Sequence, residues 1–128
     1  MTKQQIDSKT LAAFCAKEAG EKKAADIASL HVGELTTIAD YFVLCTAQSE
    51  PQMKALANWI QKSVFEKFRL KPVTVDGESV SKWILIDFGA VIIHVMTPEM
   101  RDRYQLEKLW GDAPKLKDLQ KLEKISNS

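Results

Sequence analysis

The stretch over residues 83–96 limits most strongly what this chain can fold into. It contains two apolar runs rich in isoleucine and valine, separated by the short segment 87–90. β-Branched side chains fit the pleated surface of a sheet, and Gly89 can adopt the positive φ of a tight connection. The pattern therefore predicts a β-hairpin with strands over 83–87 and 91–96. Neither run alternates between apolar and polar residues, so we expect both faces of the hairpin to be covered.

Other patterned segments around this hairpin predict further helices and strands. Apolar residues at the three- and four-residue spacing of one helix face occur in 8–20, 49–68 and 98–110. Short apolar segments typical of strands occur in 25–32, 40–46 and 72–75. The order of these elements predicts an α/β fold, a single domain in which helices flank a mixed, roughly five-stranded sheet.

The chain is expected to divide near its end into a domain and a tail. Residues 1–113 hold all the elements above, and a chain of 128 residues suits one domain with its own core. Residues 114–128 are a lysine-rich amphipathic tail, with apolar residues at Leu116, Leu119, Leu122 and Ile125. Two interpretations of the tail stay open: a loosely attached terminal helix, or a basic arm that contacts RNA or a protein partner.

The composition argues against some classes of partner and location. A formal net charge of +1 gives no strong field that would attract nucleic acid or an anionic membrane. No apolar run approaches the roughly 20 residues of a membrane-spanning helix. The first residues also lack the apolar core of a signal peptide. We therefore expect a cytoplasmic protein that does not bind membranes.

Residues suited to catalysis or metal binding are few. The chain has neither a glycine-rich phosphate-binding motif nor a nucleophile elbow. His94 lies between apolar strand residues with nothing near it in sequence to orient it, which favours a histidine packed in the sheet. Cys15 and Cys45 are predicted to be buried thiols, because no metal-binding spacing surrounds them. We therefore predict that the protein is not an enzyme and has no catalytic residues, cofactor or metal.

One group of carboxylates supports an alternative. Asp76 and Glu78 are two residues apart, and Asp87 ends a neighbouring predicted strand. Acids spaced by two on a strand point to one face, and a third could complete a divalent-metal site for phosphoryl transfer. However, the dipeptide Asp76-Gly77 is typical of a turn, which would place Glu78 in a loop. A metal-dependent nucleotidyltransferase is therefore the weaker alternative.

Aromatic and basic residues near the start of the hairpin and on the following helix suggest a binding surface. Tryptophan, tyrosine and arginine are the residue types that dominate the energetics of protein interfaces. The alternative is that most of these side chains join strand and helix within one core. The candidate partner-binding residues are Trp83, Ile84, Arg103, Tyr104, Leu109 and Trp110.

A second tryptophan has two open interpretations. Trp59 lies well off the apolar stripe of the helix over 49–68. A tryptophan in such a position either closes the edge of the core or contacts another chain. Trp59 is therefore a possible dimer contact.

Several of these segments together resemble the ribosomal silencing factor S family, also called iojap-related. The resemblance covers about residues 8–112 in order, and the tail lies outside it. It rests on the segments 25–27, 39–43, 83–87, 91–96 and 101–110. The run Trp-Ile-Leu-Ile-Asp of 83–87, followed by His-Val-Met at 94–96 and Tyr-Gln-Leu-Glu-Lys-Leu-Trp at 104–110, is its specific part.

The resemblance implies a fold and a function. The fold would be similar to that of nucleotidyltransferases, without their catalytic acids. Members of the family bind the L-fourteen protein of the large ribosomal subunit, block joining of the small subunit and so lower translation in starved or resting cells. They also tend to form homodimers when free. The contact implied here uses Trp83, Ile84 and the segment 104–110. Under the second interpretation of the tail, its lysines would add a minor contact with ribosomal RNA.

The sequence therefore predicts a translational repressor that acts by steric exclusion at the large ribosomal subunit. A factor in assembly of that subunit would use the same surface and is the alternative. The metal-dependent nucleotidyltransferase is the third, less favoured prediction.

Overall fold

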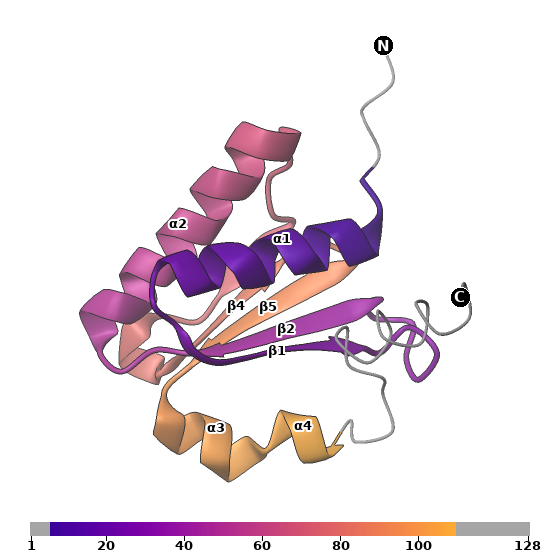
Figure 1. Cartoon of the computed structure of the whole chain (residues 1–128). Coiled ribbons are helices and arrows are strands. Elements are labelled where there is room, and N and C mark those ends of the chain that lie inside the picture. Colours follow the sequence, from indigo (N-terminus) through magenta and orange to yellow (C-terminus); the bar gives the residue numbers. More distant parts are fainter. Residues whose placement is uncertain (1–5, 110–128) are drawn as a thin grey trace, which may run out of the picture.

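A five-stranded mixed sheet organises residues 6–109, which are the residues that the computed structural model describes (Figure 1). Its strands are β1 (Ala25–His31), β2 (Tyr41–Thr46), β3 (Thr74–Asp76), β4 (Trp83–Asp87) and β5 (Val91–Met96). They lie in the order β1-β2-β5-β4-β3. The β2–β5 pair is parallel and the other three pairs are antiparallel. The predicted α/β fold with a mixed five-stranded sheet is confirmed.

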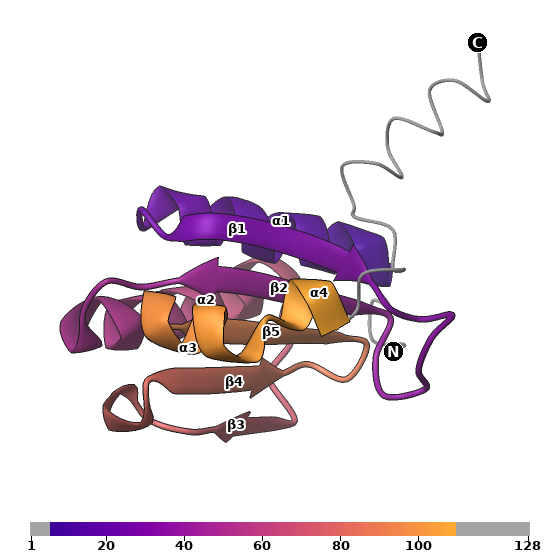
Figure 2. The ribbon, with the colours of Figure 1, turned by 90° about the horizontal axis from the view of Figure 1, so that it is seen from below.

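Helices cover both faces of the sheet, in two unequal layers. The long helices α1 (Ser8–Glu21) and α2 (Glu50–Phe68) lie on one face, and the short helices α3 (Pro98–Tyr104) and α4 (Leu106–Leu109) lie on the other (Figure 1). Seen from the side of the short helices, α3 and α4 lie over the middle of the sheet, one after the other along β2 and β5 (Figure 2). A single 3₁₀ turn, η1 (Ser79–Ser81), precedes β4.

The two central strands are buried along their whole length. All six residues of β2 and all six of β5 are buried, which agrees with their unbroken apolar sequences. Every second residue of β2 and β5 points toward α1 and α2 and packs in one cluster with Leu56, Ile60 and Val64 of α2. A smaller cluster on the opposite face includes Phe42 and Leu44 from β2 and Ile92 from β5, with Leu106 packed against it.

The predicted hairpin is confirmed with both strands at the expected residues. Phe88 N–H donates to the carbonyl of Val91 at 2.9 Å, and the Asp87 carboxylate accepts from Gly89 N–H at 2.7 Å. Gly89 has a φ of 91°, a conformation that glycine adopts without a steric penalty. The hairpin places β4 and β5 side by side, so the residues at the start of β4 lie across from the end of β5.

Two local expectations differ from the structure. The helix expected over 98–110 ends at Tyr104, because Gln105 has a left-handed φ of 43°, and a second short helix follows. The strand expected over 72–75 lies at Thr74–Asp76 instead. Pro72 lacks the N–H that a sheet ladder needs, and Val73 N–H bonds outside the regular register to the Asp87 carbonyl at 2.7 Å. The segment 110–128, including Trp110 and the tail, lies outside the described residues.

The two cysteines are buried thiols, as predicted. Cys15 on α1 and Cys45 on β2 are both completely buried and free. Burial raises the pKa of each thiol to about 12. Among residues 6–109, no helix is both long enough and apolar enough to cross a membrane.

Candidate functional site

Trp83 is the first residue of β4 and faces the short helices. It pairs with Met96 of β5 and is half-buried. Its indole N–H donates to His94 Nδ1 at 3.1 Å. Its ring lies 5.0 Å from that of Tyr104 on α3, centroid to centroid, at an angle of 53°. Tyr104 is 48% exposed, so this aromatic pair forms an accessible surface at the junction of hairpin and helix.

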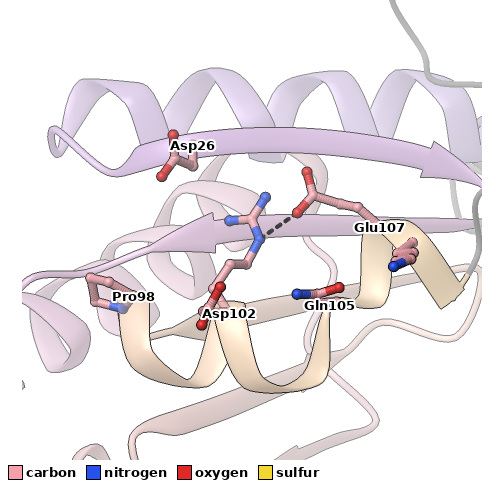
Figure 3. Close-up of a pocket in the computed structure, with 7 residues that line it drawn as sticks. Asp26, Pro98, Asp102, Gln105 and Glu107 are labelled. Carbon is pink, nitrogen blue, oxygen red and sulfur yellow. Dashed lines mark hydrogen bonds and ion pairs between the residues drawn. The ribbon is translucent and has the colours of Figure 1, made fainter.

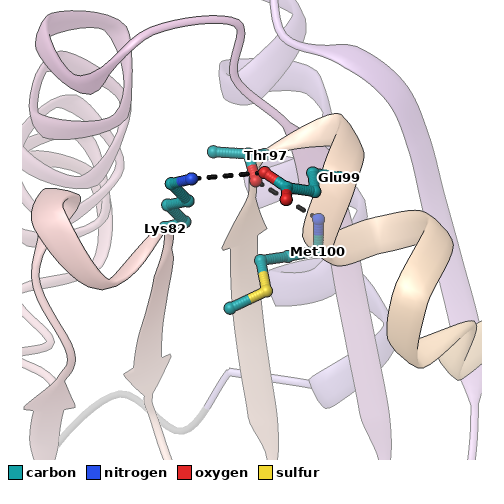
Figure 4. A network of polar contacts seen from close by, with 4 residues as sticks. All are labelled: Lys82, Thr97, Glu99 and Met100. Carbon is teal, nitrogen blue, oxygen red and sulfur yellow. Dashed lines mark hydrogen bonds and ion pairs between the residues drawn. The ribbon is translucent and has the colours of Figure 1, made fainter.

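The start of α3 is fixed to the start of β4 by polar contacts (Figure 4). Thr97 N–H donates to the Lys82 carbonyl at 3.1 Å, and Thr97 Oγ1 caps α3 by accepting from Met100 N–H at 3.3 Å. Lys82 Nζ pairs with the Glu99 carboxylate at 3.2 Å, an exposed contact that contributes little stability by itself. Together these contacts hold α3 beside Trp83.

Arg101 ties both short helices to the sheet. Only 9% of this residue is exposed. Its Nη1 donates to Thr46 Oγ1 on β2 at 2.9 Å, and its Nε donates to the Glu107 carboxylate on α4 at 2.8 Å. The Arg101 carbonyl accepts from Gln105 N–H at 3.0 Å, where the chain turns between the two helices. One guanidinium therefore connects β2, α3 and α4.

An open pocket of about 480 Å³ lies around this arginine (Figure 3). Its walls come from the start of β1 and from the two short helices. The lining residues are Asp26, Pro98, Arg101, Asp102, Gln105, Glu107 and Lys108. The side chain of Arg101 already donates hydrogen bonds to Glu107 and Thr46, so its role is to stabilise the pocket wall.

We expect Arg101→Ala to destabilise the fold by about 2 kcal/mol, because it removes two charge-assisted hydrogen bonds and leaves Glu107 without its partner. Arg103→Ala on the same helix is the matched control. Arg103 is exposed, and its loss should change the free energy of unfolding by less than about 0.5 kcal/mol. Urea unfolding of both variants measures the difference; equal losses would contradict this role of Arg101.

His94 lies beneath Trp83 in the middle of the sheet. It is 6% exposed, and the ring of Phe42 meets it edge-on at 5.1 Å. Burial, together with the smaller effect of the positive charge of Arg101, lowers the pKa of His94 to about 4. The ring is therefore neutral near pH 7, and Nδ1 is free of a proton and able to accept from the indole. No protein atom among residues 6–109 bonds its buried Nε2.

Acidification should destabilise the fold through His94. The unfolded chain binds a proton near the ordinary pKa of 6.5, whereas the folded chain binds it near 4, so the free energy of unfolding falls as the pH drops between these values. Arg101 is the charged group that acts on His94, because Leu44 and Leu85, which are paired with His94 on the adjacent strands, carry no charge. Between pH 7 and pH 4.5, urea titrations should show the wild type losing about 2 kcal/mol more than His94→Phe. Equal losses of stability in wild type and His94→Phe would contradict the assignment of this pH dependence to His94.

The structure brings together only part of the predicted binding set. Trp83 and Tyr104 are in contact, and Arg103 is exposed on the same short helix. Ile84 lies on the opposite face of β4, 5% exposed, in the core under α1 and α2. Its side chain is thus separated from the aromatic pair by the sheet. Leu109 ends α4, but its side chain and Trp110 lie outside what the structure describes.

Trp59 has its own contacts between the long helices. Its indole N–H donates to the Glu18 carboxylate on α1 at 3.0 Å, and Lys22 Nζ lies 4.3 Å from the ring centre. These contacts match the interpretation of an edge-of-core residue. The dimer contact at Trp59 stays a prediction.

The three acids of the alternative metal site do not form a cluster. Asp87 binds the hairpin turn, Asp76 ends the edge strand β3, and Glu78 lies in the loop before η1. Within residues 6–109, no three His, Cys, Asp or Glu side chains are placed to hold a metal ion.

The roles of His94 and Arg101 were missed by sequence reasoning. A signal for His94 was present, since the hairpin register places it diagonally across from Trp83 on one face. Arg101 had no such signal, because its partner Thr46 is 55 residues away in the chain.

Comparison with known proteins identifies the family. The model of the family described as "Ribosomal silencing factor during starvation" matches residues 5–128. The chain belongs to the ribosomal silencing factor RsfS family. Ribosomal silencing factor RsfS of Bacillus subtilis is 35% identical over 109 residues, which cover 85% of this chain and 92% of the relative.

Two further similar proteins extend the comparison, one through its solved structure and one through its name. A crystal structure of a protein from Chromobacterium violaceum superposes with a TM-score of 0.78 at 32% identity, covering 83% of this chain and 88% of that one. The mouse protein "Mitochondrial assembly of ribosomal large subunit protein 1" is 35% identical over 92 residues, covering 70% of this chain and 40% of its own length. The names of the Bacillus subtilis and mouse proteins both refer to the ribosome.

Proposed function

We propose that this RsfS family member is a non-enzymatic repressor of translation that binds the large ribosomal subunit through its L-fourteen protein. Occupying that surface would exclude the small subunit and prevent joining during starvation or stationary phase. The observation that carries the proposal is the accessible Trp83–Tyr104 pair, held on a hairpin and a braced helix. Family membership supplies the ribosomal partner class.

The chemistry of this face suits a folded protein partner. Aromatic side chains supply large contact areas at low entropic cost, and arginine provides directional hydrogen bonds at the rim. Trp83 and Tyr104 form the aromatic centre, and the exposed Arg103 directly precedes Tyr104 on α3. The net charge of +1 makes binding driven by the phosphate backbone of RNA the weaker explanation. A minor RNA contact through the basic tail is part of the proposal.

Co-sedimentation tests this function. The purified chain is mixed with isolated large or small ribosomal subunits and centrifuged through a sucrose cushion at two salt concentrations. The proposal predicts saturable pelleting with large subunits, retained at moderate salt, and none with small subunits. Equal pelleting with both subunits, abolished by salt, would indicate non-specific attraction to RNA and contradict the proposal.

A second candidate function is assembly of the large subunit, which the name of the mouse relative favours. An assembly factor binds precursor particles and leaves when they mature. Depletion in cells separates the two functions. Repression predicts normal large subunits with excess joined ribosomes during starvation, whereas assembly predicts accumulated precursors during growth.

The nucleotidyltransferase alternative is tested by calorimetry with Mg²⁺ and nucleotide. We expect no binding heat, since Asp76 and Asp87 belong to a strand edge and a turn. Tight binding lost in Asp87→Asn would overturn the non-enzymatic proposal. We also propose that the free protein is a cytoplasmic homodimer, which sedimentation equilibrium would measure directly.

A further inference from the structure

We propose that His94 is a positioning residue, which fixes the indole of Trp83 in the orientation that the ribosomal partner binds. The inference rests on the proposed function, because it concerns the same surface. It adds a residue that the partner does not need to touch, since His94 is 6% exposed beneath Trp83. Three observations carry it: a directed hydrogen bond, an unpaired atom on the same ring, and the arrangement of the surrounding aromatic rings.

The hydrogen bond fixes one end of the indole. Trp83 Nε1 donates to His94 Nδ1 at 3.1 Å, and the ring of Tyr104 lies 5.0 Å from the indole centre. Rotation of the indole about its side-chain torsions would break the bond and the ring contact together. A half-buried tryptophan without such a contact has several rotamers available and loses that freedom on binding. The bond therefore orders the indole before the partner arrives.

Among residues 6–109, the other ring nitrogen of His94 gives no reason for a histidine at this position. Because Nδ1 accepts, the proton of the neutral imidazole lies on Nε2. That atom is buried and has no partner among residues 6–109. A buried donor without an acceptor is unfavourable, so an apolar ring of similar size would suit the packing at least as well. What the histidine provides is an acceptor aimed at Trp83.

The neighbours hold the imidazole itself in place. Phe42 of β2 meets the imidazole edge-on, with 5.1 Å between the ring centres. Leu44 on β2 and Leu85 on β4 are paired with His94 and flank it on the adjacent strands. The backbone of β5 is buried in the centre of the sheet. His94 is thus a rigid support, whereas Trp83 sits on the partly exposed surface above it.

The test compares two substitutions whose effects on stability and on binding should differ in opposite ways. His94→Phe keeps an aromatic ring but removes the acceptor. His94→Asn keeps an acceptor near the position of Nδ1 but leaves a cavity. We expect His94→Phe to be the more stable variant and yet to bind large subunits about threefold to tenfold more weakly than wild type. His94→Asn should be less stable and bind more tightly than His94→Phe.

Hydrogen exchange of the indole N–H gives a readout that a purely structural role would not change. In nitrogen-15 spectra, the Trp83 indole proton should exchange slowly in wild type and His94→Asn, and rapidly in folded His94→Phe. The resonance is assigned by its disappearance in Trp83→Phe. Slow exchange in His94→Phe would overturn the proposal, as would binding that follows stability across both variants.

A double mutant separates this inference from the proposed function. If His94 acts through Trp83, adding His94→Phe to Trp83→Ala should cause no further loss of binding. Additive losses would overturn the positioning role. If Trp83→Ala weakens binding but His94→Phe does not, the positioning role is wrong and the proposed site stands. If wild type fails to bind large subunits, both proposals fall.

Discussion

Trp83→Ala is expected to weaken binding to large ribosomal subunits more than tenfold, while the protein stays folded. Truncating a tryptophan at the centre of an interface costs about 2 kcal/mol or more. Trp83 meets the conditions for such a residue, since it is half-buried, ordered by His94 and packed against the exposed ring of Tyr104. Quantitative co-sedimentation at constant salt measures the change.

Trp59→Ala is the matched control for this prediction. It removes a side chain of the same size from the layer of long helices, where Trp59 binds Glu18. Binding to large subunits should remain within about twofold of wild type. Circular dichroism of both variants verifies the fold. If folded Trp83→Ala binds with wild-type affinity, or if Trp59→Ala causes the larger loss, the binding face is misplaced.

Gly77→Ala should have the largest effect on stability, a loss of about 4 kcal/mol. Gly77 has a φ of 84°, and a Cβ on it would overlap the carbonyl oxygen of Trp83. Backbone atoms cannot move aside as a flexible side chain would, so the start of β4 must shift. Urea unfolding measures the loss, and binding to large subunits should fall with it, because β4 carries Trp83.

Gly89→Ala separates the effect of contact from that of backbone conformation. Gly89 also has a positive φ, 91°, but a Cβ there would meet nothing within 4 Å. This variant should lose only about 1 kcal/mol, the conformational penalty alone. Equal losses in the two variants would contradict the close approach of Gly77 to Trp83.

The sequence was sufficient to predict the elements with strong local patterns. The hairpin was predicted at the residues observed, since two β-branched runs around Gly89 allow few alternatives. The helix expected over 49–68 was also confirmed, and Ser49 Oγ caps it by accepting from Gln52 N–H at 3.2 Å. Local hydrogen bonds and side-chain periodicity determine such features within a few residues, so they can be read from the chain alone.

Features that depend on distant contacts could not be predicted in the same way. The break at Gln105 has no glycine or proline to mark it; it accompanies the bonds of Arg101 to Thr46 and Glu107. The separation of Trp83 from Ile84 could have been predicted, because consecutive strand residues face opposite sides of a sheet. Assigning both to one surface overlooked that alternation.

Subunit joining in the presence of this protein tests the central proposal most directly. Purified large and small subunits are mixed with increasing amounts of the chain, and joined ribosomes are measured by light scattering and sucrose gradients. Wild type should reduce joining in proportion to its occupancy of large subunits, and Trp83→Ala should reduce it only at more than tenfold higher concentration. Undiminished joining when wild type saturates the large subunits would contradict steric exclusion.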